Sequence, residues 1–109
     1  MTPPQAKIVF LDAATYGDVS LARFTALWDC TIHQTTKANQ TVQRLAGHGI
    51  AVTNKVEIDE RILTSPEARD LKLIAVAATG TDIIDRLAAE KHSVTVCNVP
   101  GYATESVAQ

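Results

Sequence analysis

The sequence predicts an α/β domain built on a parallel sheet, and three observations support this class. Short apolar runs, typical of strands buried on both faces, alternate along the 109 residues with segments of helical apolar spacing. The helical segments are long enough to be right-handed crossovers between parallel strands. The composition, 46% apolar and 20% charged, is that of an ordinary globular protein. A chain of this length supports one hydrophobic core.

Five strands are predicted from their apolar content. The run LKLIAVAA is the longest and is therefore the best candidate for the central strand. The segment CTIHQ is the least apolar, which is typical of an edge strand. In chain order the predicted strands lie at residues 7–13, 30–34, 49–54, 71–78 and 93–99.

Four helices are predicted between these strands. Ser20 is a suitable N-cap for the first helix, and either Asn39 or Thr41 for the second, which ends at Gly47 and Gly49. Pro66 is expected to break or restart the third. The predicted helices lie at residues 20–29, 39–47, 57–70 and 82–91, and the last residues look like the opening turn of another.

This arrangement fits a flavodoxin-like doubly wound fold, a five-stranded parallel sheet of order 2-1-3-4-5 with helices on both faces. Ligands of such sheets bind beyond the carboxyl ends of the strands. The loop after the fourth strand, ATGT at 78–81, is the most suggestive, because its small residues allow close backbone approach and helix-start N–H groups attract anions. A plain turn, with Gly80 serving the turn and Asp82 capping the helix, explains the pattern equally well.

Other polar residues give weaker indications. Lys55 could neutralise an anionic ligand at this edge, although a single lysine is more often solvated surface. The three histidines at positions 33, 48 and 92 have no partner at triad spacing and are expected at the surface or in packing. Cys30 and Cys97 lack metal-ligand spacing, so we expect two small buried thiols and no metal site.

Charge and motif content argue against several functions. A net charge of -2 and a pI of about 5.8 leave no basic surface for nucleic acid. The chain has no apolar run of membrane-spanning length and no signal-peptide pattern at its start, so we expect a cytoplasmic protein without membrane contact. It also lacks the G-x-G-x-x-G and Walker motifs that hold nucleotides.

Two stretches, LKLIAVAATGTDIID (71–85) and VTVCNVPGYATESVAQ (94–109), closely resemble the N-terminal part of the D-isomer-specific 2-hydroxyacid dehydrogenases, nearest to the glycerate dehydrogenase/hydroxypyruvate reductase branch. The resemblance extends over the whole chain. It implies that residues 1–101 form the flavodoxin-like substrate-binding (catalytic) domain and that 102–109 begin an interdomain hinge helix. The family's Rossmann domain and its catalytic Arg, Glu and His would lie beyond Gln109, so no catalytic residue is assigned.

The resemblance also implies binding roles for six residues. Ala78 and Gly80 would hold the carboxylate of a small 2-keto or 2-hydroxy acid, and Asn54 and Lys55 would lie in a loop that faces this substrate. Thr79 and Val107 would contact the nicotinamide side of NAD or NADP.

Two hypotheses about function follow. The first is the substrate-binding lobe of an NAD(P)-dependent 2-hydroxyacid dehydrogenase, inactive and without cofactor when isolated. The alternative is a stand-alone flavodoxin-like folding module, excised or engineered, with no catalytic role. In either case we expect the chain to expose an apolar face. Self-association, or exchange of the C-terminal segment GYATESVAQ between two copies of the chain, would cover this face.

Overall fold

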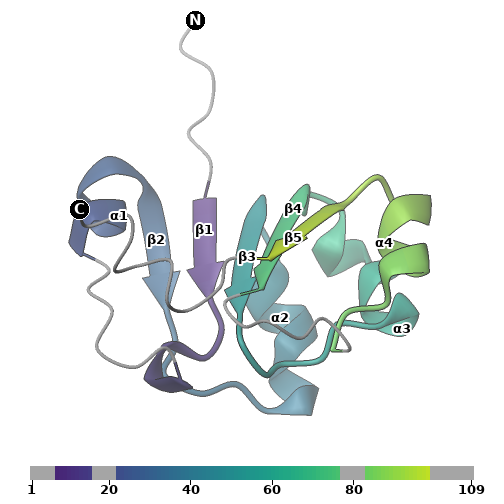
Figure 1. The fold of residues 1–109 in the computed structure, drawn as a ribbon, viewed down its shortest axis with the longest axis horizontal. Coiled ribbons are helices and arrows are strands. Elements are labelled where there is room, and N and C mark those ends of the chain that lie inside the picture. The colour runs from purple at the N-terminus through teal and green to yellow at the C-terminus, as the bar shows by residue number, and fades with distance from the viewer. Residues whose placement is uncertain (1–6, 16–21, 77–82, 99–109) are drawn as a thin grey trace, which may run out of the picture.

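The predicted sheet is present in the structure, a computed structural model that describes residues 7–15, 22–76 and 83–98. Five parallel strands pair in the order β2-β1-β3-β4-β5, which confirms the predicted topology (Figure 1). Each strand is four residues long: β1 Lys7–Phe10, β2 Asp29–Ile32, β3 Ile50–Thr53, β4 Leu73–Val76 and β5 Thr95–Asn98.

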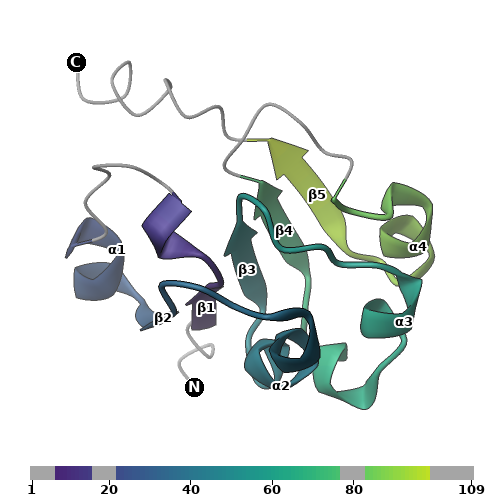
Figure 2. The same cartoon turned by 90° about the horizontal axis from the view of Figure 1, so that it is seen from below.

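Helices lie on both faces of this sheet, as predicted. Figure 2 shows α2, α3 and α4 on one face and α1 on the other, beside β2. The break expected at Pro66 is confirmed, because this proline occupies the first turn of a separate 3-10 helix. The α-helices are α1 Ala22–Leu27, α2 Thr41–Leu45, α3 Glu60–Leu63 and α4 Arg86–Lys91; the 3-10 helices are η1 Ala13–Thr15, η2 Ala38–Gln40 and η3 Pro66–Ala68.

The core lies between the sheet and the layer formed by α2, α3 and α4. Along β3 and β4 every second residue is buried, which places one set of side chains under the helices. Ile74 and Val76 are fully buried and join one continuous apolar cluster. The alternate residues, on the opposite face, are only half-buried: Ile50, Val52, Leu73 and Ala75.

The fourth helix begins later than predicted. Its N-cap is Asp85, whose carboxylate accepts the N–H of Ala88 at 3.0 Å. Ile84, which the sequence placed inside the helix, instead forms a parallel bridge with Ile58 and is buried. The burial of this apolar pair therefore moves the helix start beyond residue 84, while Asp82 lies outside the described residues.

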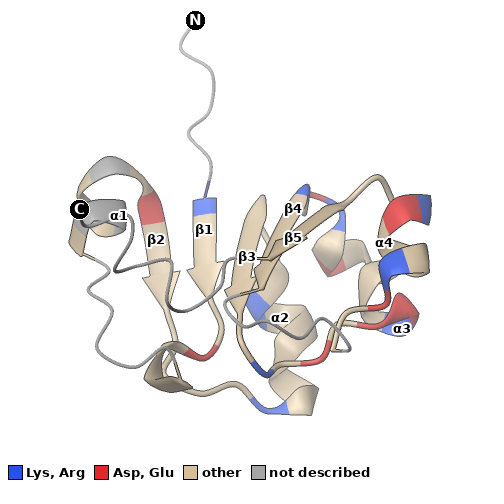
Figure 3. Cartoon of the chain, in the orientation of Figure 1, with Lys and Arg blue, Asp and Glu red and all other residues tan. Residues whose placement is uncertain are grey.

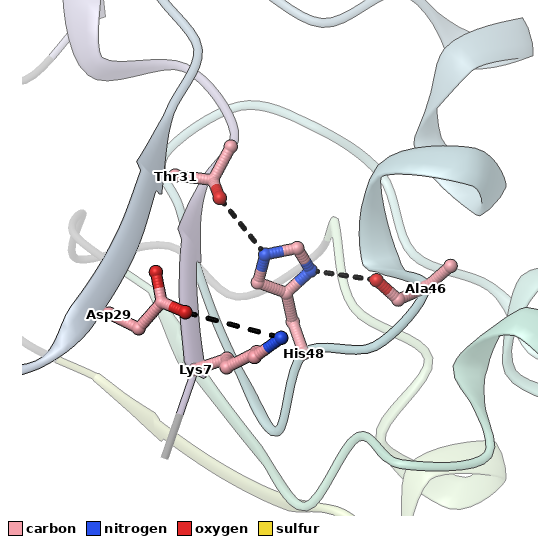
Figure 4. Close-up of polar contacts among 5 residues, drawn as sticks. All are labelled: Lys7, Asp29, Thr31, Ala46 and His48. Carbon is pink, nitrogen blue, oxygen red and sulfur yellow. Dashed lines mark hydrogen bonds and ion pairs between the residues drawn. The ribbon is translucent and has the colours of Figure 1, made fainter. Parts of the chain in front are cut away.

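The turn between α2 and β3 is fixed by Gly47 and His48. Gly47 has φ +78°, a conformation that glycine adopts without a Cβ penalty. The ring of His48 bonds the carbonyl of Ala46 at 2.9 Å and Oγ1 of Thr31, in the edge strand, at 3.2 Å (Figure 4). His48 thus connects this turn to β2, which agrees with the packing role expected of it.

Both cysteines are free but less buried than predicted. Cys30 and Cys97 lie on strands at opposite edges of the sheet and are half-buried. Burial, with a smaller contribution from the neighbouring Asp29 carboxylate, raises the pKa of the Cys30 thiol. Within the described ranges, no His, Cys, Asp and Glu side chains cluster as metal ligands, and no helix could cross a membrane.

Candidate functional site

The carboxyl ends of β1 and β3 meet at the side chain of Asp12. Asp12 is 3% exposed, and its carboxylate accepts main-chain N–H groups from the loop that follows β3. Asn54 N lies 2.9 Å from Oδ1 and 3.1 Å from Oδ2, and Lys55 N lies 2.6 Å from Oδ2. The hydroxyl of Thr53 lies 3.5 Å from Oδ2 and 3.4 Å from the carbonyl of Val56, and its one proton can be donated to either acceptor. One carboxylate therefore holds two consecutive amides of the loop.

The strand register produces this arrangement. Phe10 is opposite Val52 in the sheet, and the N–H of Leu11 donates to the carbonyl of Val52 at 2.9 Å. Asp12 then follows at the level where β3 ends. The loop turns at once, because Oγ1 of Thr53 accepts the N–H of Val56 at 2.9 Å. Both features direct the amides of the loop toward Asp12.

Asp12 forms no ion pair with any residue in the described part of the chain. A buried carboxylate is costly unless hydrogen bonds replace its hydration, and here the loop amides supply them. Bonds from N–H groups to an ionised carboxylate are stronger than those between neutral groups. The conformation of residues 54 and 55 is consequently tied to the presence of a carboxylate at position 12.

The structure describes two of the six predicted site residues, Asn54 and Lys55, and their side chains have different surroundings. Asn54 is half-buried, and its Nδ2 donates to the carbonyl of Thr15 at 3.0 Å. This hydrogen bond connects the loop to η1. Lys55 is exposed and makes no ion pair within the described ranges. The other four predicted residues, Ala78, Thr79, Gly80 and Val107, lie outside the described residues, as does the predicted domain boundary at residue 101.

An open pocket of about 360 Å³ lies beside this loop, with Asp12, Lys55 and Glu57 in its lining. Threonines from η1, the β2–α2 connection and α2 also line it, together with Ala38 and Val56. Several of their hydroxyl protons are already donated to main-chain carbonyls: Thr15 to Asp12, Thr36 to Leu11 and Thr41 to Lys37. The pocket therefore offers hydroxyl and carboxylate oxygens as acceptors and the Lys55 ammonium as a donor.

The chemistry available here is binding rather than bond making. Among the described residues, two threonine hydroxyls lie within hydrogen-bond distance of a possible base: Thr31 beside His48, and Thr53 beside Asp12. Thr31 does not line the pocket and Thr53 is fully buried, so neither is placed to attack a bound ligand. Figure 3 shows basic and acidic residues interspersed along the described elements, so Lys55 is a local charge rather than part of a basic face.

Sequence reasoning gave no role to Asp12 or to Thr53. The available signal was an acidic residue placed directly after an apolar strand. Its partners are 42 and 43 residues away in the chain, so only the strand pairing reveals them.

Comparison with known proteins agrees with the fold. Residues 8–109 match the family model for the D-isomer specific 2-hydroxyacid dehydrogenase catalytic domain. The chain is 40% identical over 102 residues to glycerate dehydrogenase of Methylorubrum extorquens, covering 93% of this chain and 32% of that protein. It is 28% identical over 108 residues to hydroxypyruvate reductase of Blautia hydrogenotrophica, covering 94% of this chain and 33% of the relative.

A solved structure with the same fold is the NAD+-bound 3-phosphoglycerate dehydrogenase of Entamoeba histolytica, with a TM-score of 0.71 at 22% identity. The match covers 96% of this chain and 36% of that structure. The chain thus spans about a third of the length of the relatives that it matches. The family match and the 40% identity show that this chain belongs to the D-isomer-specific 2-hydroxyacid dehydrogenases, in the segment that forms their catalytic domain.

Proposed function

We propose that the chain forms the substrate-binding part of an NAD(P)-dependent 2-hydroxyacid dehydrogenase of the glycerate/hydroxypyruvate type. The proposal rests on the family match over residues 8–109 and on the similarity to relatives named glycerate dehydrogenase and hydroxypyruvate reductase. In the reaction, a hydride passes from the nicotinamide to C2 of a 2-keto acid and the carbonyl oxygen takes a proton. The reverse direction oxidises the 2-hydroxy acid.

Lys55 has the role that the geometry supports best. Its ammonium group is exposed at the carboxyl edge of the sheet, beside an open pocket and without an ion-pair partner in the described ranges. Such a group attracts the carboxylate of a 2-keto acid. Asn54 would act beside it through its carboxamide oxygen, since its Nδ2 is bonded to Thr15.

The remaining roles are proposed from the family resemblance. Main-chain N–H groups near Ala78 and Gly80 would hold the substrate carboxylate, and Thr79 and Val107 would contact the nicotinamide. The cofactor-binding domain and the acid–base residues would come from the rest of such an enzyme. We therefore expect the 109-residue chain alone to show no turnover.

A hybrid enzyme tests this proposal. In the hybrid, residues 8–109 of this chain replace the matching segment of Methylorubrum extorquens glycerate dehydrogenase, to which it is 40% identical. NADH oxidation with hydroxypyruvate is followed by absorbance, and NADH binding is measured separately by fluorescence. The parent enzyme and the isolated chain are the controls.

We expect the hybrid to reduce hydroxypyruvate and the isolated chain to show no rate above background. A hybrid that folds and binds NADH, yet reduces neither hydroxypyruvate nor glyoxylate, would contradict the proposal. It would favour a folding module without a catalytic role.

A further inference from the structure

Asp12 differs from the other aspartates that accept main-chain N–H groups in the described part of the chain. Asp59 and Asp85 each accept one N–H, from Ile62 and Ala88, and cap the exposed starts of α3 and α4. Asp12 is buried and directly precedes η1, yet its carboxylate accepts N–H groups from two consecutive residues of the loop after β3, at the edge of the sheet where such folds bind ligands. Its burial therefore needs an explanation other than helix capping.

We propose that Asp12 is a positioning residue that holds the Asn54–Lys55 loop in the conformation that presents Lys55 to the substrate carboxylate. This inference rests on the proposed function for its effect on catalysis. The hydrogen bonds themselves can be tested without it.

The pattern of donors requires a carboxylate at this position. Oδ2 receives the N–H of Lys55 and the second bond from Asn54, while Oδ1 receives the shorter bond from Asn54. Both oxygens are thus acceptors only. In Asp12→Asn one of them becomes an NH₂ group, which would face an N–H donor in a buried space.

Rotation of the introduced amide does not remove this conflict. If its nitrogen replaces Oδ2, it opposes the N–H of Lys55; if it replaces Oδ1, it opposes the N–H of Asn54. In the first orientation the N–H of Lys55 loses its acceptor; in the second the N–H of Asn54 loses its shorter bond and keeps only the longer one to the oxygen at the Oδ2 position. We therefore expect Asp12→Asn to release the loop while it leaves the volume of the side chain almost unchanged.

The first test uses the 109-residue chain. A through-hydrogen-bond scalar coupling between the backbone nitrogen of Lys55 and the carboxylate carbon of Asp12 is expected in the wild-type NMR spectrum. In Asp12→Asn, amide exchange at Asn54 and Lys55 should accelerate by about tenfold or more relative to the rest of β3. Asp85→Asn is the matched control, because it makes the same change in a carboxylate that accepts an N–H away from the loop.

The absence of the coupling in wild type would overturn the inference even if Asp12→Asn fails to fold. Equal exchange at Asn54 and Lys55 in Asp12→Asn and Asp85→Asn would also overturn it.

The second test measures Asp12→Asn in the hybrid enzyme. Loss of loop positioning should raise KM for hydroxypyruvate about tenfold and change kcat by less than about threefold, because it removes substrate binding rather than a chemical step. Asp85→Asn should change neither constant. If Asp12→Asn lowers only the amount of folded enzyme, the residue is merely structural. If the wild-type hybrid is inactive while the NMR results hold, the proposed function fails and the hydrogen bonds remain established.

Discussion

The carboxylate of Asp12 accepts the main-chain N–H of Lys55 at 2.6 Å, across 43 residues of sequence. This bond joins the end of one central strand to the loop after its neighbour, at the side of the sheet where doubly wound folds bind ligands. The bond links the buried carboxylate of Asp12 to the backbone of Lys55, whose exposed ammonium group we propose as a substrate contact. The stability of the domain and the geometry of its site therefore depend on the same side chain.

Removal of the Asp12 carboxylate should destabilise the domain markedly. Asp12→Ala leaves the N–H groups of Asn54 and Lys55 without an acceptor, and each unpaired, partly buried amide costs about 1–3 kcal/mol. We expect a loss of about 3 kcal/mol in the free energy of unfolding, measured by urea denaturation. Asp85→Ala, which removes a helix cap, should cost about 1 kcal/mol. Equal losses in the two variants would contradict this assignment.

The fold was predicted well because its signals are local. The apolar runs at 7–13, 49–54 and 71–78 each contain an observed strand, and their alternation with helices was sufficient for the strand order. The start of α4 was placed wrongly, because Asp82 and Asp85 both look like N-caps in the sequence. The choice between them depends on the burial of Ile84 against Ile58, a tertiary contact that the sequence pattern does not contain.

The site was predicted less completely. The resemblance identified the loop containing Asn54 and Lys55, but the bond from Asn54 to Thr15 depends on how two distant loops pack. The hydrogen bonds of Asp12 likewise depend on tertiary packing, because their donors lie in the loop after a different strand, β3. Sequence reasoning therefore predicted a site at this edge of the sheet but did not predict that Asp12 holds the loop.

The length of its apolar run predicts β4 at the centre of the sheet, whereas β4 lies next to the edge strand β5, but it should still contain a sensitive core position. Ile74 is fully buried in β4, and Ile74→Ala should lower the free energy of unfolding by about 2–5 kcal/mol through lost burial and a residual cavity. Leu87→Ala is a suitable control, because Leu87 is 76% exposed on α4 and its truncation should change stability by less than about 0.5 kcal/mol. Urea denaturation of both variants measures the contrast. A loss below about 1 kcal/mol for Ile74→Ala would show that this strand is not central to the core.

His33 should make the domain less stable in mildly acidic solution. Desolvation by burial, followed by the positive charges of Arg44 and His48, lowers the pKa of His33 below its ordinary value of 6.5. The unfolded chain then binds the proton more readily, so this part of the stability is present above about pH 6.5 and is lost as the pH falls toward the folded pKa.

Unfolding free energies of wild type and His33→Gln, compared at about pH 7.5 and 5.5, measure this contribution. The decrease between the two pH values should be smaller in His33→Gln. An identical decrease in both proteins would contradict the lowered pKa, and NMR titration of the His33 ring checks its direction independently.

The isolated chain should self-associate through the less covered face of the sheet. Ile50, Val52, Leu73 and Ala75 are half-buried there, whereas their neighbours along β3 and β4 are buried under helices. Parallel sheets are normally covered on both faces, so a second copy would bury this surface. Sedimentation over a range of concentrations measures the effect. A sharp monomer at every concentration would count against it.

The most direct test of the proposed substrate-binding role is the KM of Lys55→Gln in the hybrid enzyme with hydroxypyruvate. Loss of the ammonium group should raise KM about tenfold with kcat changed by less than about threefold, because a bond to a charged group is removed from substrate binding. Lys72→Gln removes another exposed lysine, next to the start of β4 and away from the loop, and should leave KM unchanged. If Lys55→Gln and Lys72→Gln have the same KM as the unmodified hybrid, Lys55 does not bind the substrate and the account of this site is wrong.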